Sequence, residues 1–306
     1  MVIRTSVDLG VELCGIPLET PLIPASGTLS KEALDEARGV YGAMLPKTVT
    51  PAPRAGNPPP RLAETPAGMV NSIGLQNPGM ERFIEDLDAY EIGTPLIISV
   101  AGDTVAEFVT LCARLADDGR VAGVELNLSC PNVEHGGLTF CAGPASVAEV
   151  VGACRAALPD KPVLVKLTNE GVKANSLAAE EAGADGLTLI NTIPAISVDP
   201  KSRSILRGGL SGPAIKPVAL RAVYEVSAEV RIPVIGCGGV TRGTDVAEFM
   251  LAGATAVQVG TASFVREPRQ VLEELVDYLE KQELGAGDLT GLLQASHRET
   301  TGDKAG

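Results

Sequence analysis

The residues best suited to chemistry in this sequence lie in the stretch ELNLSCPN, residues 125–132. A strand-like run ends there at Cys130, and Pro131 follows it directly. Because proline has no N–H to donate to a sheet, the strand must end at this point. A thiol at the end of a strand could act as a base or a nucleophile, and the flanking amides of Asn127 and Asn132 could bind a polar ligand. The same residues would also suit an ordinary turn with a small buried cysteine.

Few other side chains could serve as a base near neutral pH. The sequence has 2 histidines. His297 lies in the polar C-terminal stretch, and His135 lies in the loop just after Cys130. A position close to Cys130 would allow His135 to tune or cover a site, but we expect it to be a solvated loop residue.

The composition restricts the class of protein. The formal net charge of -13 argues against a surface that binds nucleic acid or an anionic membrane. The N-terminus lacks the apolar core of a signal peptide, and no stretch of about 18 apolar residues follows, so we expect a soluble, cytoplasmic protein.

The cysteines are spread along the chain without CxxC spacing, so we expect no metal site, no iron–sulfur cluster and no disulfide framework. Any metal cluster that takes part in the chemistry must therefore lie on another chain. The 6 cysteines are Cys14, Cys112, Cys130, Cys141, Cys154 and Cys237.

Short β-rich runs recur along the chain, and stretches with helical periodicity lie between them. Strands that alternate with helices form right-handed βαβ units and a parallel sheet buried on both faces. Eight such units predict an α/β fold, a (β/α)₈ TIM barrel. The predicted strands are 20–26, 42–50, 95–102, 123–129, 163–168, 186–192, 233–239 and 256–263. The predicted helices include 104–118, 145–158, 172–182, 214–229 and 243–252.

The remaining segments are expected to decorate one barrel domain that spans residues 1–306. Residues 1–19 contain a predicted β-hairpin that plugs the bottom of the barrel. Residues 51–79 and 193–212 are predicted to be irregular excursions that form lids or walls of the site. Residues from about 285 to 306 become polar and glycine-rich, and we expect a flexible tail there.

Active sites of such barrels lie at the carboxyl ends of the strands, and here those ends are polar. Buried polar groups cost free energy unless a ligand or another group satisfies them, so a purely structural barrel would not need them. The residues at these ends are Lys47, Thr48, Asn127, Ser129, Cys130, Lys166, Asn191, Thr192, Gly238, Gly239, Gly260 and Thr261.

The glycines at the ends of the last two predicted strands favour a phosphate site. Backbone N–H groups at Gly238, Gly239 and Gly260 could form an anion-binding concavity at the starts of the following helices. The alternative is that these glycines serve only tight turns. Lys166 could offset the charge of an electron-rich ring, although a lone lysine can equally extend to solvent, and Lys47 has the same two interpretations.

Seven stretches of the sequence resemble class 1 dihydroorotate dehydrogenases, and the similarity runs from about residue 6 to 283. GNPPPRLAET (56–65) and GGLSGPA (208–214) are most similar to the class 1B catalytic subunit, which passes electrons to NAD through a separate subunit with FAD and an iron–sulfur cluster. The stretches are PASGT (24–28), PRLAETPAGMVNSIGLQNPG (60–79), ELNLSCPN (125–132), INT (190–192), GGLSGPAIKPVALRAVYEVS (208–227), IGCGGV (235–240) and VGTA (259–262).

The resemblance implies an FMN-dependent oxidation of dihydroorotate to orotate, a step in the biosynthesis of the pyrimidine UMP. It makes Cys130 the base that removes the C5 proton while a hydride passes from C6 to N5 of FMN. Removal of a proton next to a carbonyl needs a base in a closed, water-poor site. It also implies one FMN per chain, with FAD and a 2Fe-2S cluster only on the partner subunit. A homodimer of this chain, assembled with the partner into a heterotetramer, is the implied assembly.

The resemblance further implies which residues bind each ligand. Amide side chains suit a substrate ring that carries both donors and acceptors. For the substrate the implied residues are Lys47, Asn71, Ser72, Ile73, Gly74, Leu75, Asn127, Asn132, Asn191 and Thr192. For FMN they are Ala25, Ser26, Lys47, Thr48, Ser99, Asn127, Lys166, Ile190, Gly212, Gly238, Gly239, Gly260 and Thr261.

Three other functions remain open from the sequence. A class 1A enzyme that reduces fumarate has the same barrel and base. A dihydropyrimidine dehydrogenase-like subunit has a similar motif, but Asn132 would be expected to differ there. A flavin-free binding barrel would not need Cys130, Lys47 and Lys166 together.

Overall fold

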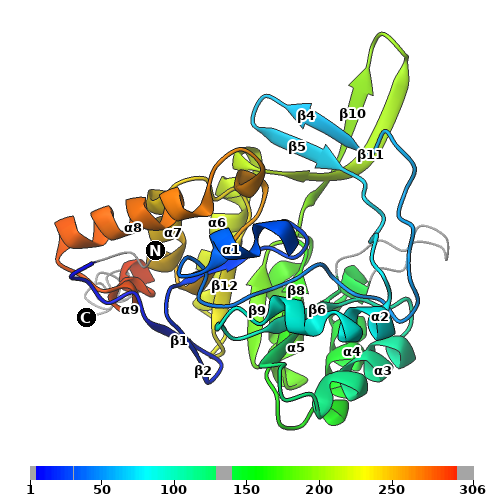
Figure 1. Ribbon diagram of the computed structural model, residues 1–306, viewed down its shortest axis with the longest axis horizontal. Helices are drawn as coiled ribbons and strands as arrows, with labels where there is room; N and C mark the ends of the chain where they lie inside the picture. Colours follow the sequence, from blue (N-terminus) through cyan, green and yellow to red (C-terminus); the bar gives the residue numbers. More distant parts are fainter. Residues whose placement is uncertain (1–4, 30, 129–139, 295–306) are drawn as a thin grey trace, which may run out of the picture.

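A curled parallel sheet forms the centre of the molecule (Figure 1). The computed structural model describes residues 5–29, 31–128 and 140–294. The sheet has 7 strands in the order β3-β13-β12-β9-β8-β7-β6. They are β3 (Leu22–Pro24), β6 (Ile97–Val100), β7 (Gly123–Asn127), β8 (Val163–Leu167), β9 (Gly186–Leu189), β12 (Val234–Cys237) and β13 (Ala254–Val259).

The extended segment 42–50 lies between the two edge strands and closes the sheet into a barrel. On one side, the N–H of Gly42 donates to the carbonyl of Leu22 in β3 at 2.9 Å. On the other side, the N–H of Val49 donates to the carbonyl of Ser99 in β6, also at 2.9 Å. The segment therefore takes the place of the second predicted strand, and the predicted TIM barrel is confirmed.

Helices cover the outer face of the sheet, as predicted (Figure 1). In α3, the hydroxyl of Thr104 caps the first turn by accepting from the N–H of Glu107 at 3.2 Å, and Phe108 and Leu111 bury one face. The longer helices are α3 (Val105–Ala116), α4 (Pro144–Ala157), α5 (Val172–Glu181), α6 (Lys216–Ser227), α7 (Gly243–Leu251) and α8 (Pro268–Gln282). Short helical segments are η1 (Lys31–Ala33), α1 (Leu34–Ala37), α2 (Met80–Glu85), η2 (Leu87–Tyr90), η3 (Phe140–Ala142), η4 (Pro213–Ile215), η5 (Thr261–Phe264) and α9 (Ala286–Leu289). Among the described residues, no helix is long and apolar enough to cross a membrane.

The N-terminal hairpin closes the bottom of the barrel, as predicted. Strands β1 (Val11–Leu13) and β2 (Ile16–Leu18) pair antiparallel. Leu13, Ile16 and Leu18 are buried in one cluster with apolar side chains from the starts of the barrel strands. The hairpin thus removes the lowest layer of the barrel interior from water.

The two segments predicted to be irregular, 51–79 and 193–212, contain strands, so that prediction is wrong in part. They form an antiparallel sheet in the order β10-β11-β5-β4, which stands out from the barrel (Figure 1). The glycines and prolines of both segments are more typical of loops, and the pairing of β11 with β5 joins two hairpins that are distant in sequence and leaves no local signal. The strands are β4 (Leu62–Thr65), β5 (Gly68–Asn71), β10 (Ile193–Asp199) and β11 (Ser204–Ser211).

Residues 285–294 pack on the body of the protein, so the flexible tail does not begin at 285 as expected. Ala286 and Leu289 are fully buried, and the N–H of Ala286 donates to the carbonyl of Asp8 at 2.8 Å. The polar, glycine-rich composition concealed these two apolar contacts. Residues 295–306 lie outside the described residues.

We predict that Leu13→Ala destabilises the protein, because it leaves a cavity between the hairpin and the barrel. A loss of about 2–5 kcal/mol in the free energy of unfolding is expected for a fully buried leucine. Urea unfolding measures it, with Glu12→Ala as the matched control because Glu12 is exposed in the same strand. A loss no larger than that of the control would mean that the hairpin does not plug the barrel.

Candidate active site

A layer of buried polar side chains lies directly above the apolar bottom of the barrel. Along a strand, residues that are two positions apart point to the same face of the sheet. Each of these polar residues lies two positions after a residue that faces the bottom layer, so its side chain also points into the barrel. This layer contains Ser99 of β6, Glu125 of β7, Lys166 of β8, Thr188 of β9, Cys237 of β12 and Gln258 of β13.

Lys166 lies at the centre of this layer and is 4% exposed. Its ammonium group donates to Oε1 of Gln258 at 2.8 Å. The Nε2 of Gln258 in turn donates to Oε2 of Glu125 at 2.7 Å, and Thr188 Oγ1 donates to the same oxygen at 2.9 Å. The charge of Lys166 therefore has a buried carboxylate as a counter-charge, with an amide group between them.

The surroundings of Lys166 favour its charged form. Burial opposes the charge, but the contact with Cys237 and the negative charge of Glu125 favour it, and the pKa of Lys166 is raised. Burial also raises the pKa of the Cys237 thiol, which keeps that group neutral. The site thus presents one fixed positive charge from inside the barrel.

Three hydroxyl groups form a chain on another side of the barrel mouth. The hydroxyls of Ser26 and Thr48 lie 3.1 Å apart, and those of Thr48 and Ser99 lie 2.9 Å apart. The structure therefore brings together three predicted cofactor-binding residues. Their hydroxyls can each donate or accept.

Two of the predicted substrate-binding asparagines meet at the ends of β7 and β9. Asn191 Nδ2 donates to Oδ1 of Asn127 at 3.3 Å, and Asn191 Oδ1 accepts from the N–H of Thr192 at 2.8 Å. A side chain at Gly209 of β11 would lie 2.0 Å from the Thr192 hydroxyl oxygen, so the antiparallel sheet approaches the mouth closely here.

The predicted substrate loop, residues 71–75, leaves β5 beside this cluster. Asn71 Nδ2 donates to the carbonyl of Gly209 at 3.4 Å. The loop then turns through two consecutive left-handed residues, Gly74 with φ 73° and Leu75 with φ 51°. A left-handed leucine is uncommon and indicates that the surroundings hold the backbone in place. Ser72 and Ile73 are half-buried within the same loop.

Asn77 is the residue that holds this loop, and the sequence did not reveal it. Its Nδ2 donates to the Thr50 hydroxyl at 2.7 Å and to the carbonyl of Leu75 at 2.8 Å. Its Oδ1 accepts from the N–H groups of Thr50 and Gly79 at 3.2 and 2.8 Å. An Asn-Pro-Gly sequence is typical of turns, and only the fold brings Thr50 beside Asn77.

Lys47 lies across the loop that follows β3. A Cβ added to Gly27 would lie 2.6 Å from Cδ of Lys47 and 3.1 Å from its Nζ. Gly27, with φ 80°, therefore leaves the space that the lysine occupies. Lys47 itself is half-buried.

The predicted phosphate-binding residues converge at the ends of β12 and β13. A Cβ at Gly239 would lie 2.8 Å from the carbonyl oxygen of Gly212, and one at Gly212 would lie 3.5 Å from Cγ2 of Thr261. A Cβ at Gly260 would lie 3.3 Å from Cβ of Ala25. Glycine at these positions lets backbone segments pack closely around the strand ends, and backbone N–H groups beside the starts of helices suit an anion such as phosphate. Gly238 has φ 128° and packs against α6.

The remaining predicted site residues are placed as follows. Ile190 is buried, and its N–H donates to the carbonyl of Cys237 at 2.7 Å. Cys130, Asn132 and His135 lie outside the described residues, so their roles stay predictions. Glu125, Thr188 and Gln258 were not predicted from the sequence, although a charged residue inside the apolar run 123–126 was a signal that could have revealed Glu125.

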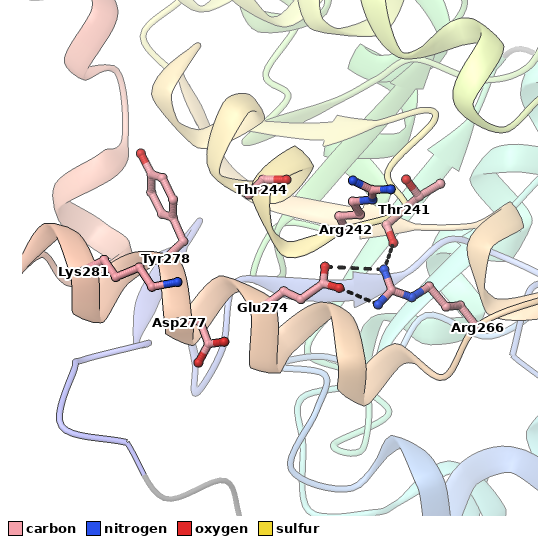
Figure 2. A pocket seen from close by; sticks show the side chains of 8 residues that line it. All are labelled: Thr241, Arg242, Thr244, Arg266, Glu274, Asp277, Tyr278 and Lys281. Atoms are coloured by element: carbon pink, nitrogen blue, oxygen red, sulfur yellow. Dashed lines mark hydrogen bonds and ion pairs between the residues drawn. The ribbon is translucent and has the colours of Figure 1, made fainter.

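A separate hollow of about 720 Å³ lies between α7 and α8 (Figure 2). The Arg266 guanidinium forms an ion pair with Glu274 and donates to the carbonyl of Thr241 at 2.8 Å. None of the predicted site residues lines this hollow, so it is distinct from the polar layer of the barrel. Its lining residues are Thr241, Arg242, Thr244, Arg266, Glu274, Asp277, Tyr278 and Lys281.

Comparison with known proteins gives consistent matches. The dihydroorotate dehydrogenase family model matches residues 8–282. The chain is 44% identical over 301 residues to the catalytic subunit of dihydroorotate dehydrogenase B (NAD(+)) from Pelobacter propionicus, covering 94% of this chain and 99% of the relative. It is 46% identical over 288 residues to the protein of the same name from Geobacter metallireducens, covering 89% and 93%. A crystal structure of DHODH from Eimeria tenella in complex with ferulenol superposes with a TM-score of 0.81 and 25% identity, covering 97% of this chain and 91% of the other.

We predict that Asn77→Ala loosens the loop 71–79. The change leaves buried partners of Asn77 unsatisfied, and each such group costs about 1–3 kcal/mol. Amide hydrogen exchange across 71–79 should become faster, while the barrel strands stay protected. The matched control is Gln76→Ala, because Gln76 is the exposed neighbour. Equal exchange rates in the two variants would show that Asn77 does not hold the loop.

Proposed function

Because the chain belongs to the dihydroorotate dehydrogenase family, we propose that it oxidises dihydroorotate to orotate for pyrimidine biosynthesis at the polar mouth of the barrel, with FMN as cofactor. The observation that carries this proposal is the buried, charged Lys166 beneath a mouth of amides and hydroxyls. A barrel without a ligand there would bury these groups at a cost in free energy.

The described residues fit FMN. Lys166 would lie at the pyrimidine edge of the flavin, and the hydroxyls of Ser26, Thr48 and Ser99 would bind beside it. Gly212, Gly238, Gly239, Gly260 and Thr261 lie close together at the ends of β12 and β13, and backbone N–H groups at such strand ends, beside the starts of helices, would suit a phosphate. FMN, when bound, supplies an acceptor for the hydride that leaves C6 of the substrate.

The substrate would lie against the amides above the flavin position. Asn127 and Asn191 contact each other, and Asn71 lies on the facing sheet, so amides approach the ring from two sides. We also assign Asn132, Thr192, Lys47 and the backbone of residues 72–75 to the substrate. A lysine suits the substrate carboxylate, and amides suit ring N–H and carbonyl groups.

Cys130 is assigned as the base that removes the C5 proton. An unperturbed thiol has a pKa near 8.5, so only a small fraction is thiolate at neutral pH. A closed site that excludes water would let the thiolate take the proton without competition from solvent. The assignment rests on the position of Cys130 after β7 and on the resemblance of SCPN to the family motif.

Cys130→Ala should slow reduction of the bound FMN by dihydroorotate about 10²- to 10⁴-fold, which is the usual effect of losing a general base. FMN should remain bound, since the change removes only the thiol. Stopped-flow absorbance under anaerobic conditions measures the rate, and Cys112→Ala controls for the loss of a thiol, because Cys112 lies on the buried face of α3. Reduction at the parental rate would exclude Cys130 as the base.

We further propose that the chain works with an electron-transfer subunit that carries FAD and a 2Fe-2S cluster, as a heterotetramer built on a homodimer. The name "catalytic subunit" of its relatives supports this assembly. Ile196, Val198 and Ile205 are more than half exposed on the antiparallel sheet, and exposed apolar patches are typical of protein–protein contacts. A mouth closed over orotate could not admit a nicotinamide to the same flavin face, so electrons would leave toward a partner.

The isolated chain should reduce an artificial dye with dihydroorotate but should not reduce NAD. Steady-state assays with a dye, NAD or fumarate as the acceptor test this directly. NADH should form only after a cognate electron-transfer subunit is added. Rapid NADH formation by the chain alone would refute the proposed relay, and rapid fumarate reduction would indicate a class 1A enzyme instead.

A further inference from the structure

We propose that Glu125 is a positioning residue that keeps Lys166 charged and correctly placed at the pyrimidine edge of the flavin, acting through the amide of Gln258. The inference rests on the proposed function, because that proposal places FMN beside Lys166. Glu125 lies in the middle of β7, below the mouth, and has no exposed surface. It therefore acts through other side chains rather than on the substrate.

The hydrogen-bond geometry fixes the direction of the Gln258 amide. Because Glu125 is a carboxylate, it can only accept, so the Nε2 of Gln258 must face it at 2.7 Å. The Oε1 of Gln258 then faces Lys166 and accepts from its ammonium group at 2.8 Å. A neutral side chain at position 125 could also donate, and the amide of Gln258 would then be free to turn its donor toward Lys166.

Thr188 fixes the carboxylate from the neighbouring strand. Its Oγ1 donates to the same oxygen, Oε2, at 2.9 Å, which leaves Oε1 without a hydrogen-bond partner among the described residues. A buried carboxylate that is only partly satisfied lowers stability by itself. Its presence is explained if its charge is needed, and the buried ammonium of Lys166 is the charge that it balances.

The groups that face Lys166 come from four strands. Within the described part of the chain, Glu125 of β7 and Cys237 of β12 are the titratable groups acting on it, and β9 and β13 contribute the uncharged Thr188 and Gln258. Because burial raises the pKa of Cys237, its thiol stays neutral and Glu125 supplies the negative charge. A neutral side chain at position 125 would remove this negative charge, so burial would act against the charged form of Lys166 without a carboxylate to oppose it.

The test is the affinity for FMN as a function of pH, measured by fluorescence titration of the apo-protein. In the parent, Lys166 stays charged, so its contribution to affinity should not change between about pH 6 and 9. In Glu125→Gln, Lys166 should lose its proton within this range, and the affinity should fall about ten- to a hundredfold as pH rises. The double variant Glu125→Gln/Lys166→Met should show no such titration, because the titrating group is gone.

Thr188→Val is the matched control, because it removes a hydrogen bond of Glu125 without changing any charge. It should show no new titration. The proposal is overturned if Glu125→Gln shows no titration, or if the titration persists in the double variant. If Glu125→Gln does not fold, folding of the double variant supports the proposal, and failure of both contradicts it. Failure of the parent to bind FMN would instead refute the proposed function.

Discussion

The structure depends on burying one positive charge inside a parallel β-barrel. Lys166 points into the interior from β8, where a single ammonium group would be very costly without partners. Gln258 and Glu125 supply the partners from β13 and β7, strands that lie on opposite sides of β8 and β9 in the sheet order. Lys166 can therefore be buried in its charged form only because the sheet closes into a barrel, which brings the side chains of these strands together.

The same closure explains the layers of the interior. The hairpin of residues 11–18 seals the apolar bottom, so water cannot reach the polar layer from below. Above that layer, the antiparallel sheet approaches the mouth so closely that a side chain at Gly209 would collide with Thr192. A charge enclosed in this way interacts more strongly with a ligand than one in water. The fold thus holds the charged side chain in a preformed binding site.

Much of this arrangement was predictable from the sequence, and the exceptions have physical causes. The alternation of strand and helix periods identified the barrel. Active sites of such barrels lie at the carboxyl ends of the strands, so the residues at those ends identified Lys166, Asn127 and the glycines. Glu125 and Gln258 were not identified, because a polar residue within a strand becomes informative only when its facing partner is known. Pairing of β5 with β11 and the contact of Asn77 with Thr50 are equally non-local.

The most direct test of the account is an anaerobic titration of the purified chain with dihydroorotate, followed by the visible absorbance of its flavin. The account predicts that the protein purifies with FMN and that stoichiometric dihydroorotate bleaches the flavin, with orotate as the product. A protein that folds but binds no flavin, or a bound flavin that dihydroorotate leaves oxidised, would contradict it.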